Sequence, residues 1–470
     1  MKVIDLKTKQ EISAYLMPNP EPPSVIQGRV LLYDATKFSG NGEATCASCH
    51  IFGDMDDLAW DLGNPDEKVS KSAIPIVFRN LLPFLNLAGG GVATPLNGSG
   101  TPEDFHPMKG PFTTQTLRGL ANAGAMHWRG DRSVGATGND PFDANTSFNN
   151  FIVAFQGLVG SVNTPSKAEM QQFTDFQLQV LPPPNPVRNL DNSMTASQTR
   201  GLAFYAGARP SDGINSAALD AILGKSSFNC NGCHVLDASQ GFFGTGRSQS
   251  FENLPQIVKV PHLRNAYAKI GMFGTPALGF FDAPDSGKMG DQVRGFGFTG
   301  DGSDDTLFRF FTASVFAPTA NSGFPQQDPD GARRDMEQLM LAFDSDLAPI
   351  VGQQVTLTSS NASSAGKRID LLIQRASAPF TSKSLAATSA MECDLVASLV
   401  RNGKLESLLY DPNKRVFVPN DGSPMLSDGA LRNLATTAGQ EVTYTAATPG
   451  SGLRVRSLVD SNQHVGRRQR

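Results

Sequence analysis

One short motif occurs twice in the sequence and combines residues that can attach a metal cofactor. Each copy reads C-x-x-C-H, with Cys46, Cys49 and His50 in the first copy and Cys230, Cys233 and His234 in the second. Two cysteines one helical turn apart match the two vinyl groups of a haem, and the histidine that follows can bind the iron. Two copies in a chain with five cysteines and six histidines predict two covalently attached haems of the c type.

Other uses of paired cysteines fit this sequence poorly. A zinc site built from both pairs needs them on the order of 15 to 20 residues apart, whereas a large part of the chain separates Cys49 from Cys230. A thioredoxin-like redox pair lies near a βαβ pattern, and neither motif has one around it. The fifth cysteine, Cys393, is predicted to be a buried thiol without a chemical role.

Composition and charge narrow the class of protein. The chain has 470 residues, which predicts several domains, and a formal net charge of −4, which argues against nucleic-acid binding. No apolar run approaches about 18 residues, so we expect no membrane span. Because bacteria attach c-type haems outside the cytoplasmic membrane, we expect a periplasmic or extracellular protein. No apolar leader follows Met1, so the sequence is interpreted as a processed form or as part of a longer precursor.

The pattern of apolar residues and turn residues predicts four parts. Residues 1–24 are interpreted as a short hairpin and a proline-rich linker. Residues 25–186 and 187–350 each contain one motif and are predicted to form the first and second haem domains, and residues 351–470 form an appendage. Helices are predicted over residues 27–33, 148–158, 168–181, 195–206, 333–343 and 367–376, and strands over residues 354–358 and 441–445.

The two parts that carry a motif are related to each other. Thr116 to Gly119 (TLRG) can be overlaid on His262 to Asn265 (HLRN), and each segment follows the motif of its own part. A methionine, Met126 or Met272, lies nine residues past the leucine of each segment. This common spacing indicates a duplicated module that holds one haem.

Longer segments around these residues resemble a known family. Residues 112–132 (FTTQTLRGLANAGAMHWRGDR) and 258–274 (VKVPHLRNAYAKIGMFG), with both motifs, are similar to segments of the di-haem cytochrome c peroxidase and MauG superfamily. The resemblance covers roughly residues 25–343. It implies a mainly α fold with two cytochrome c-like haem domains that contain long loops. The strand and helix patterns of the last 120 residues add a small C-terminal appendage of the α+β or β class. The resemblance also implies, in many members, a calcium ion between the domains, and an electron-passing tryptophan between the haems, which Trp128 matches.

The sixth ligand of each iron is expected within these segments. Met272 is the expected ligand of the second haem. For the first haem, His127 is favoured because imidazole binds both oxidation states of iron, and the duplication makes Met126 the alternative. Arg118 and Arg264 occupy matching positions, and the planar guanidinium of each is expected to pair with haem propionates.

Three functions follow from these expectations. With both irons six-coordinate, the chain relays electrons between a small redox protein and an acceptor, which is the function we favour. With one iron open, it reduces hydrogen peroxide; family peroxidases carry His-Asp-Gly where this sequence reads Phe273-Gly274-Thr275. In the third, the haem part accepts electrons for a binding β-propeller, because residues 1–24 resemble the last strands of a YVTN-type propeller repeat. The sequence predicts no oligomeric state.

Overall fold

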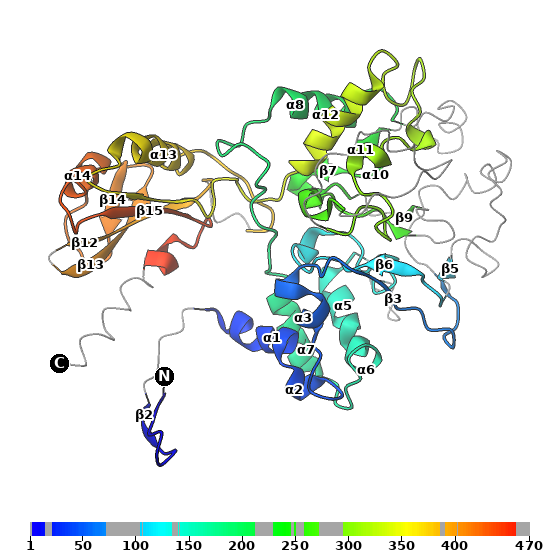
Figure 1. Cartoon of the computed structure of the whole chain (residues 1–470), viewed down its shortest axis with the longest axis horizontal. Coiled ribbons are helices and arrows are strands. Elements are labelled where there is room, and N and C mark those ends of the chain that lie inside the picture. The colour runs from blue at the N-terminus through cyan, green and yellow to red at the C-terminus, as the bar shows by residue number, and fades with distance from the viewer. Residues whose placement is uncertain are drawn as a thin grey trace. The chain divides into compact units, whose positions relative to one another are not determined.

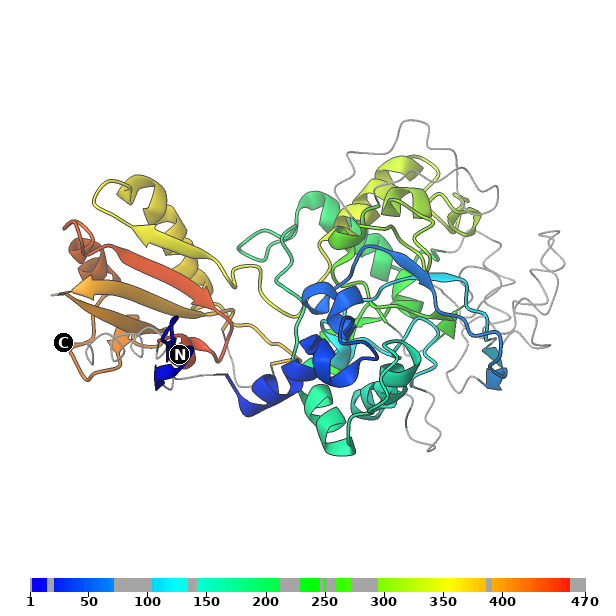
Figure 2. The same ribbon diagram turned by 60° about the horizontal axis from the view of Figure 1, so that its bottom comes forward.

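The chain divides into two compact units, which Figures 1 and 2 show from two directions. The structure is a computed structural model and describes residues 2–14, 21–71, 104–105, 107–133, 140, 142–211, 229–245, 249–250, 258–271, 295–385, 391–401 and 403–456. The motif unit consists of Gln27–Pro349 and Ser382–Ala386 and contains both C-x-x-C-H motifs. The sheet unit consists of Met1–Ile26, Ile350–Thr381 and Ala387–Arg470.

Short helices joined by long loops build the first half of the motif unit. Its helices are α1 (Pro23–Tyr33), α2 (Ala35–Phe38), α3 (Cys46–Cys49), η1 (Ile51–Gly53), η3 (Leu120–Asn122), α5 (Ala144–Asn149), η4 (Asn150–Val153), α6 (Ala154–Gly157) and α7 (Lys167–Gln177). The short strands are β3 (Ala59–Asp61), β4 (Ser70–Lys71), β5 (Asp104–Phe105) and β6 (Pro111–Thr113). β3 pairs with β6, and β4 pairs with β5, both antiparallel.

The second half of the motif unit is built in the same way. Its helices are α8 (Ala196–Ala206), α10 (Cys230–Cys233), η5 (Ala238–Gln240), η6 (Ala266–Lys269), α11 (Leu307–Phe310), η7 (Ser314–Phe316) and α12 (Pro329–Leu341). Its short strands are β7 (Leu236–Asp237), β8 (Phe242–Phe243), β9 (Gln249–Ser250) and β10 (Val258–Lys259). β7 pairs with β8, and β9 with β10.

In each half, an early helix crosses a late helix at a glycine. A Cβ atom at Gly28 in α1 would lie 2.2 Å from the backbone oxygen of Gln172 in α7. A Cβ atom at Gly201 in α8 would lie 2.3 Å from the backbone oxygen of Asp335 in α12. Because real Cβ atoms do not approach so closely, only glycine allows these helix backbones to touch. The two halves therefore share a construction principle as well as a motif.

Start signals in the sequence account for the longer helices. Ser166 and Glu169 form a capping box at the first turn of α7. Thr195 and Gln198 form another at the first turn of α8. The helices predicted over residues 168–181, 195–206 and 333–343 are confirmed as α7, α8 and α12, whereas the one predicted over 148–158 is broken into α5, η4 and α6. No helix in the described part of the chain is both long and apolar enough to cross a membrane.

Phenylalanine rings fill the core of both halves. In the first half, the rings of Phe148 and Phe173 meet edge to face with centroids 5.1 Å apart. In the second half, Phe311 meets Phe324 in the same manner at 5.6 Å. Edge-to-face contacts between rings stabilise a core beyond the burial of their area. This packing explains why a chain with few tyrosines contains 30 phenylalanines.

A five-stranded antiparallel sheet forms the centre of the sheet unit. The strands are β11 (Gln354–Leu357), β12 (Asp394–Arg401), β13 (Lys404–Asp411), β14 (Val416–Pro419) and β15 (Val442–Ala447), in the order β11-β15-β12-β13-β14. The helices are α13 (Ala362–Arg375), which contacts β11 and β15, and α14 (Asp428–Leu434), which contacts β15. Val442, Tyr444 and Ala446 alternate along β15 and are buried. The hairpin of β1 (Lys2–Ile4) and β2 (Glu11–Ala14) is exposed along nearly its whole length.

The prediction of a mainly α fold with two cytochrome c-like domains is wrong. Of the residues that the structure describes, 34% are helical and 16% lie in strands, and the C-terminal part contains a five-stranded sheet. The sequence predicted β11, α13 and β15 but not the strands between them. The division of residues 25–350 into two separate haem domains stays a prediction.

Candidate functional site

The two C-x-x-C-H motifs adopt the same backbone conformation. Each pair of cysteines begins and ends a single helical turn, α3 or α10. His50 and His234 end these turns with identical backbone angles, φ −91° and ψ 67°. The N–H of each histidine donates to the carbonyl oxygen of the first cysteine of its motif at 2.9 Å. None of the four motif cysteines forms a disulfide.

Backbone carbonyls orient the two histidine rings. Nδ1 of His50 lies 3.3 Å from the carbonyl oxygen of Asp54. Nδ1 of His234 lies 2.8 Å from the carbonyl oxygen of Gly244 and 3.2 Å from that of Pro261. Because a carbonyl oxygen only accepts hydrogen bonds, Nδ1 carries the proton, and Nε2 keeps the lone pair that a metal ligand needs. Burial lowers the pKa of both histidines, which also favours the neutral ring.

The segments that follow the motifs have similar backbone conformations. The N–H of Leu117 donates to the carbonyl oxygen of Gly53 at 3.1 Å, and the N–H of Leu263 donates to that of Phe243 at 3.0 Å. Two residues further on, Gly119 and Asn265 both have left-handed backbone angles, with φ of 72° and 62°. A 3-10 helix then begins in each half. The sequence overlay of TLRG on HLRN is thus confirmed in the backbone.

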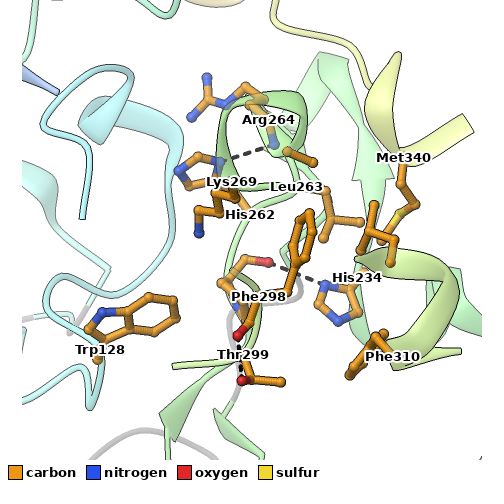
Figure 3. Close-up of a pocket in the computed structure, with 13 residues that line it drawn as sticks. Trp128, His234, His262, Leu263, Arg264, Lys269, Phe298, Thr299, Phe310 and Met340 are labelled. Atoms are coloured by element: carbon orange, nitrogen blue, oxygen red, sulfur yellow. Dashed lines mark hydrogen bonds between the residues drawn. The ribbon is translucent and has the colours of Figure 1, made fainter. Parts of the chain in front are cut away.

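A pocket opens beside His234, and Figure 3 shows its lining. The empty space in it, counted together with open solvent at its mouth, is about 620 Å³. One wall is apolar and consists of Leu263, Ala266, Phe298, Leu307, Phe310 and Met340. The polar side chains Arg264, His262 and Lys269 lie together, and none of the described lining residues is acidic. The pocket can therefore hold a flat apolar group that carries negative charge.

Arg264 fits a negatively charged group better than Arg118 does. Nη2 of Arg264 donates to the carbonyl oxygen of Gly119 at 2.7 Å, but its Nε and Nη1 are buried without a hydrogen-bond partner among the described residues. Burial lowers the pKa of Arg264 to about 10. Arg118 is partly exposed and already pairs with Asp54 at 3.0 Å. The unused N–H donors of Arg264 match the carboxylate of a bound group, whereas Arg118 already pairs with the carboxylate of Asp54.

Trp128 lies between the two halves of the motif unit and faces the pocket. Its side chain is buried, and its Nε1–H donates to the carbonyl oxygen of Thr113 at 2.6 Å. The ring stacks on Phe112 with centroids 6.1 Å apart. Trp128 comes from the first half but lines the same pocket as His234, which lies opposite it in Figure 3. An aromatic ring in this position links the two halves.

The two residues before Trp128, His127 and Met126, have different surroundings. His127 has a left-handed φ of 68°, which is costly for a residue other than glycine. Its Nδ1 lies 2.5 Å from Oδ1 of Asp131, so Nε2 is left for another partner. Met126 is buried, and its N–H donates to Oγ of Ser133 at 2.8 Å. Burial alone would raise the pKa of the Asp131 carboxyl, but the nearby charge and hydrogen bond of His127 lower it.

Other sequence-based expectations lie partly beyond the described residues. Met272, the expected ligand of the second haem, lies outside them. A calcium ion stays a prediction; the described ranges contain no group of three or more His, Cys, Asp or Glu side chains arranged to hold a metal. Cys393 is buried, and burial raises the pKa of its thiol to about 12.

Two lysines near the pocket had no role in the sequence-based predictions. Lys259 is buried, and its Nζ donates to the carbonyl oxygen of Ala125 at 2.9 Å. Burial and the neighbouring charge of Lys269 lower the pKa of Lys259 to about 7. Nζ of Lys269 lies 5.2 Å from the ring centroid of Trp128. The overlay of the two halves could have revealed these lysines. It aligns them with Thr113 and Ala123, so only the second half has a charged side chain at either position.

Comparisons with known proteins add little to this description. No protein-family model matches the chain, and no curated protein sequence does. Among solved structures, a hydrazine synthase of Kuenenia stuttgartiensis, studied under 20 bar of xenon, is similar over 69% of this chain and 89% of its own. The sequence identity is 15% and the TM-score is 0.39. A likeness at this level carries no argument about fold or function.

Proposed function

We propose that this chain is a di-haem redox protein, which binds one haem covalently at each C-x-x-C-H motif and passes single electrons between a donor and an acceptor. The supporting observation is the common backbone frame of the two motifs. His50 and His234 share their backbone angles, and carbonyl oxygens hold Nδ1 of both. A zinc site built from both pairs is disfavoured by the length of chain between Cys49 and Cys230.

When bound, haem supplies one-electron chemistry, and the described residues supply its attachment and surroundings. The thiols of each motif would form the thioether bonds, and Nε2 of His50 or His234 would bind the iron. At the second motif, the apolar wall of the pocket excludes water. The two unused donors of Arg264 bind a propionate there. We propose His127 and Met272 as the sixth ligands.

Electron relay agrees better with the pocket than peroxide reduction does. Heterolysis of a peroxide bond requires a side chain that accepts and returns a proton close to the iron. The described lining of the pocket beside His234 contains no carboxylate, and burial and the charges of Arg264 and Lys259 hold the pKa of its other imidazole, His262, well below its usual range, so that His262 accepts a proton poorly. Trp128, by contrast, has the burial and the rigid hydrogen bond to Thr113 that suit a fixed electron path between the halves. We therefore propose a small redox protein as partner and a location outside the cytoplasm.

A spectroscopic redox titration tests this function. The protein, produced with a haem-attachment system, should be reduced in two one-electron steps that show c-type haem spectra. Trp128→Phe should slow electron transfer between the two sites, observed after rapid reduction, while both potentials stay in place. Leu263→Phe, which also alters the pocket wall, serves as a packing control and should leave this rate higher than Trp128→Phe does. Fast turnover of hydrogen peroxide by the oxidised protein would favour the peroxidase instead.

A further inference from the structure

Lys259 is a buried amine that has no carboxylate partner among the residues that the structure describes. Its side chain is 4% exposed, and the hydrogen bond of its Nζ goes to the neutral carbonyl of Ala125. A buried cation is stable only with a partner of opposite charge, and otherwise it releases its proton. Lys259 therefore stands apart from the motif unit's buried Arg309, which pairs with Asp305.

The charged groups that the described part of the chain places around Lys259 are cationic. Lys269 faces it from η6 and acts on it electrostatically. On its own segment, His262 and Arg264 follow, and His262 experiences the charges of Lys259, Lys269 and Arg264. The facing turn of the first half offers the carbonyl oxygens of Ala125 and Trp128. Among the described residues, none with a negative charge contributes to the surroundings of Lys259.

This cluster adjoins the place where an electron is proposed to arrive. His262, Arg264 and Lys269 line the pocket beside His234, and Figure 3 shows them grouped on one side of it. Lys259 continues the cluster behind this wall, where its backbone N–H donates to the carbonyl oxygen of Trp128 at 2.8 Å. An added negative charge in the pocket would stabilise the ammonium form of a nearby unpaired amine.

We infer that Lys259 is a redox-linked proton site: when a one-electron donor reduces the site of the second motif, the Nζ amine takes up one proton from solvent, and it releases that proton on oxidation. One electron and one proton enter together, so the net charge of the site is unchanged. This inference rests on the proposed di-haem function. The lowering of the pKa of Lys259 to about 7 supports it, because both forms of the amine are then accessible near neutral pH.

Potentiometric titration of the holoprotein at several values between about pH 5 and about pH 9 tests this inference. The step of the second motif, identified as the one that Cys230→Ala combined with Cys233→Ala removes, should fall in potential as pH rises, toward a slope of one proton per electron. Lys259→Met should abolish this slope. Lys259→Arg should abolish it too, at a higher potential than Lys259→Met, because its charge is permanent.

Lys269→Met is the matched control. It removes a cation from the same cluster and should keep the slope, but it should move the sloping region to higher pH, because Lys269 lowers the pKa of Lys259. A slope that persists in Lys259→Met, or a second step without pH dependence in the unmodified protein, would overturn the inference.

A second measurement applies if the Lys259 variants do not fold. NMR of side-chain-labelled lysine in the unmodified protein should show one lysine amine gaining a proton on reduction, and unchanged lysine protonation would overturn the inference. Failure of the proposed function is recognised separately, because the purified chain would then carry fewer than two haems by intact mass.

Discussion

The regions around the two motifs share a backbone and differ in charge. His50 receives its carbonyl partner from Asp54, an acidic residue, whereas His234 receives it from Gly244, which has no side chain. In the overlay of the halves, Lys259 stands at the position of Thr113, and Lys269 stands at the position of Ala123. The second region thus gains two lysines and loses a carboxylate relative to the first.

This difference concerns the charges around each histidine and not the backbone that holds it. Burial lowers the pKa of both histidines, but the charges of Asp54 and Asp56 offset part of this effect at His50, whereas only backbone carbonyls do so at His234. The backbone angles of His50 and His234 are identical, as one common attachment geometry would require. Residues around them are free to differ, and a cationic surrounding favours the reduced, more negative state of a redox site. The two sites are therefore expected to differ in potential for electrostatic reasons alone.

Removing one attachment site should have the largest effect. In Cys230→Ala combined with Cys233→Ala, the second redox step should disappear while the first keeps its potential and spectrum. The corresponding change at Cys46 and Cys49 should do the reverse. Redox titration with haem staining of the denatured chain checks both. Loss of both redox steps in either double variant would show that the folding of one site depends on the haem of the other.

The stability of the protein should depend on Lys259 through pH. Its pKa is about 7 in the folded chain and about 10.5 when exposed. Between these values the unfolded chain binds a proton that the folded chain does not, so the free energy of unfolding should rise with pH across this window, by on the order of a few kcal/mol. Urea unfolding near both ends of the window measures the rise. Lys259→Met should lack it, and Lys167→Met, at an exposed position, should retain it.

The sequence predicted the single helical turn of each motif correctly, whereas its prediction of the fold class is wrong. The motifs are local in sequence, since covalent attachment fixes the spacing of cysteines and histidine, and the repeated Leu-Arg segment supplied the overlay. Burial of Lys259 could not be read from the sequence, because it results from contact with Ala125 in the other half. An exposed lysine and a buried one look the same in a single sequence.

The missed strands of the sheet unit have a similar cause. In β12, Leu395, Ala397 and Leu399 face one side, but Val396 and Val400 make the other side apolar too, which hides the alternation of a strand. In β13, the spacing of its leucines imitates one face of a helix. Pairing with neighbouring strands decides such segments, and that information lies outside the segment itself.

Replacing the glycine at the helix crossing should lower the stability of the protein by a similar amount in the two halves. Gly28→Val and Gly201→Val each place a side chain against a helix backbone, so each should lower the free energy of unfolding by about 3 kcal/mol. Gly157→Ala is the control, because no atom lies within 4 Å of a Cβ there, and it should change stability by no more than about 1 kcal/mol. Chemical denaturation measures all three. A tolerated valine in one half would disprove that crossing.

Replacing Arg264 or Arg118, the two matching arginines, should lower the stability of the protein by different amounts. Arg264→Gln removes buried hydrogen bonds to the carbonyl oxygens of Gly119 and Asn122 and should cost about 2 kcal/mol of stability. Arg118→Gln removes a partly exposed pair with Asp54 and should cost less than about 1 kcal/mol. Thermal denaturation of the two variants side by side compares them. Equal losses would mean that Arg264 is not the more deeply engaged residue.

Intact mass of the denatured protein tests whether both motifs hold a haem. The protein should be produced with a haem-attachment system and extracted with acidic organic solvent, which removes haem that is not covalently bound. We expect the mass of the polypeptide plus two haems, together with two redox steps of different potential in the native protein. A mass of the polypeptide alone, or with one haem, would contradict the proposal that the common frame around His50 and His234 serves the same attachment in both halves.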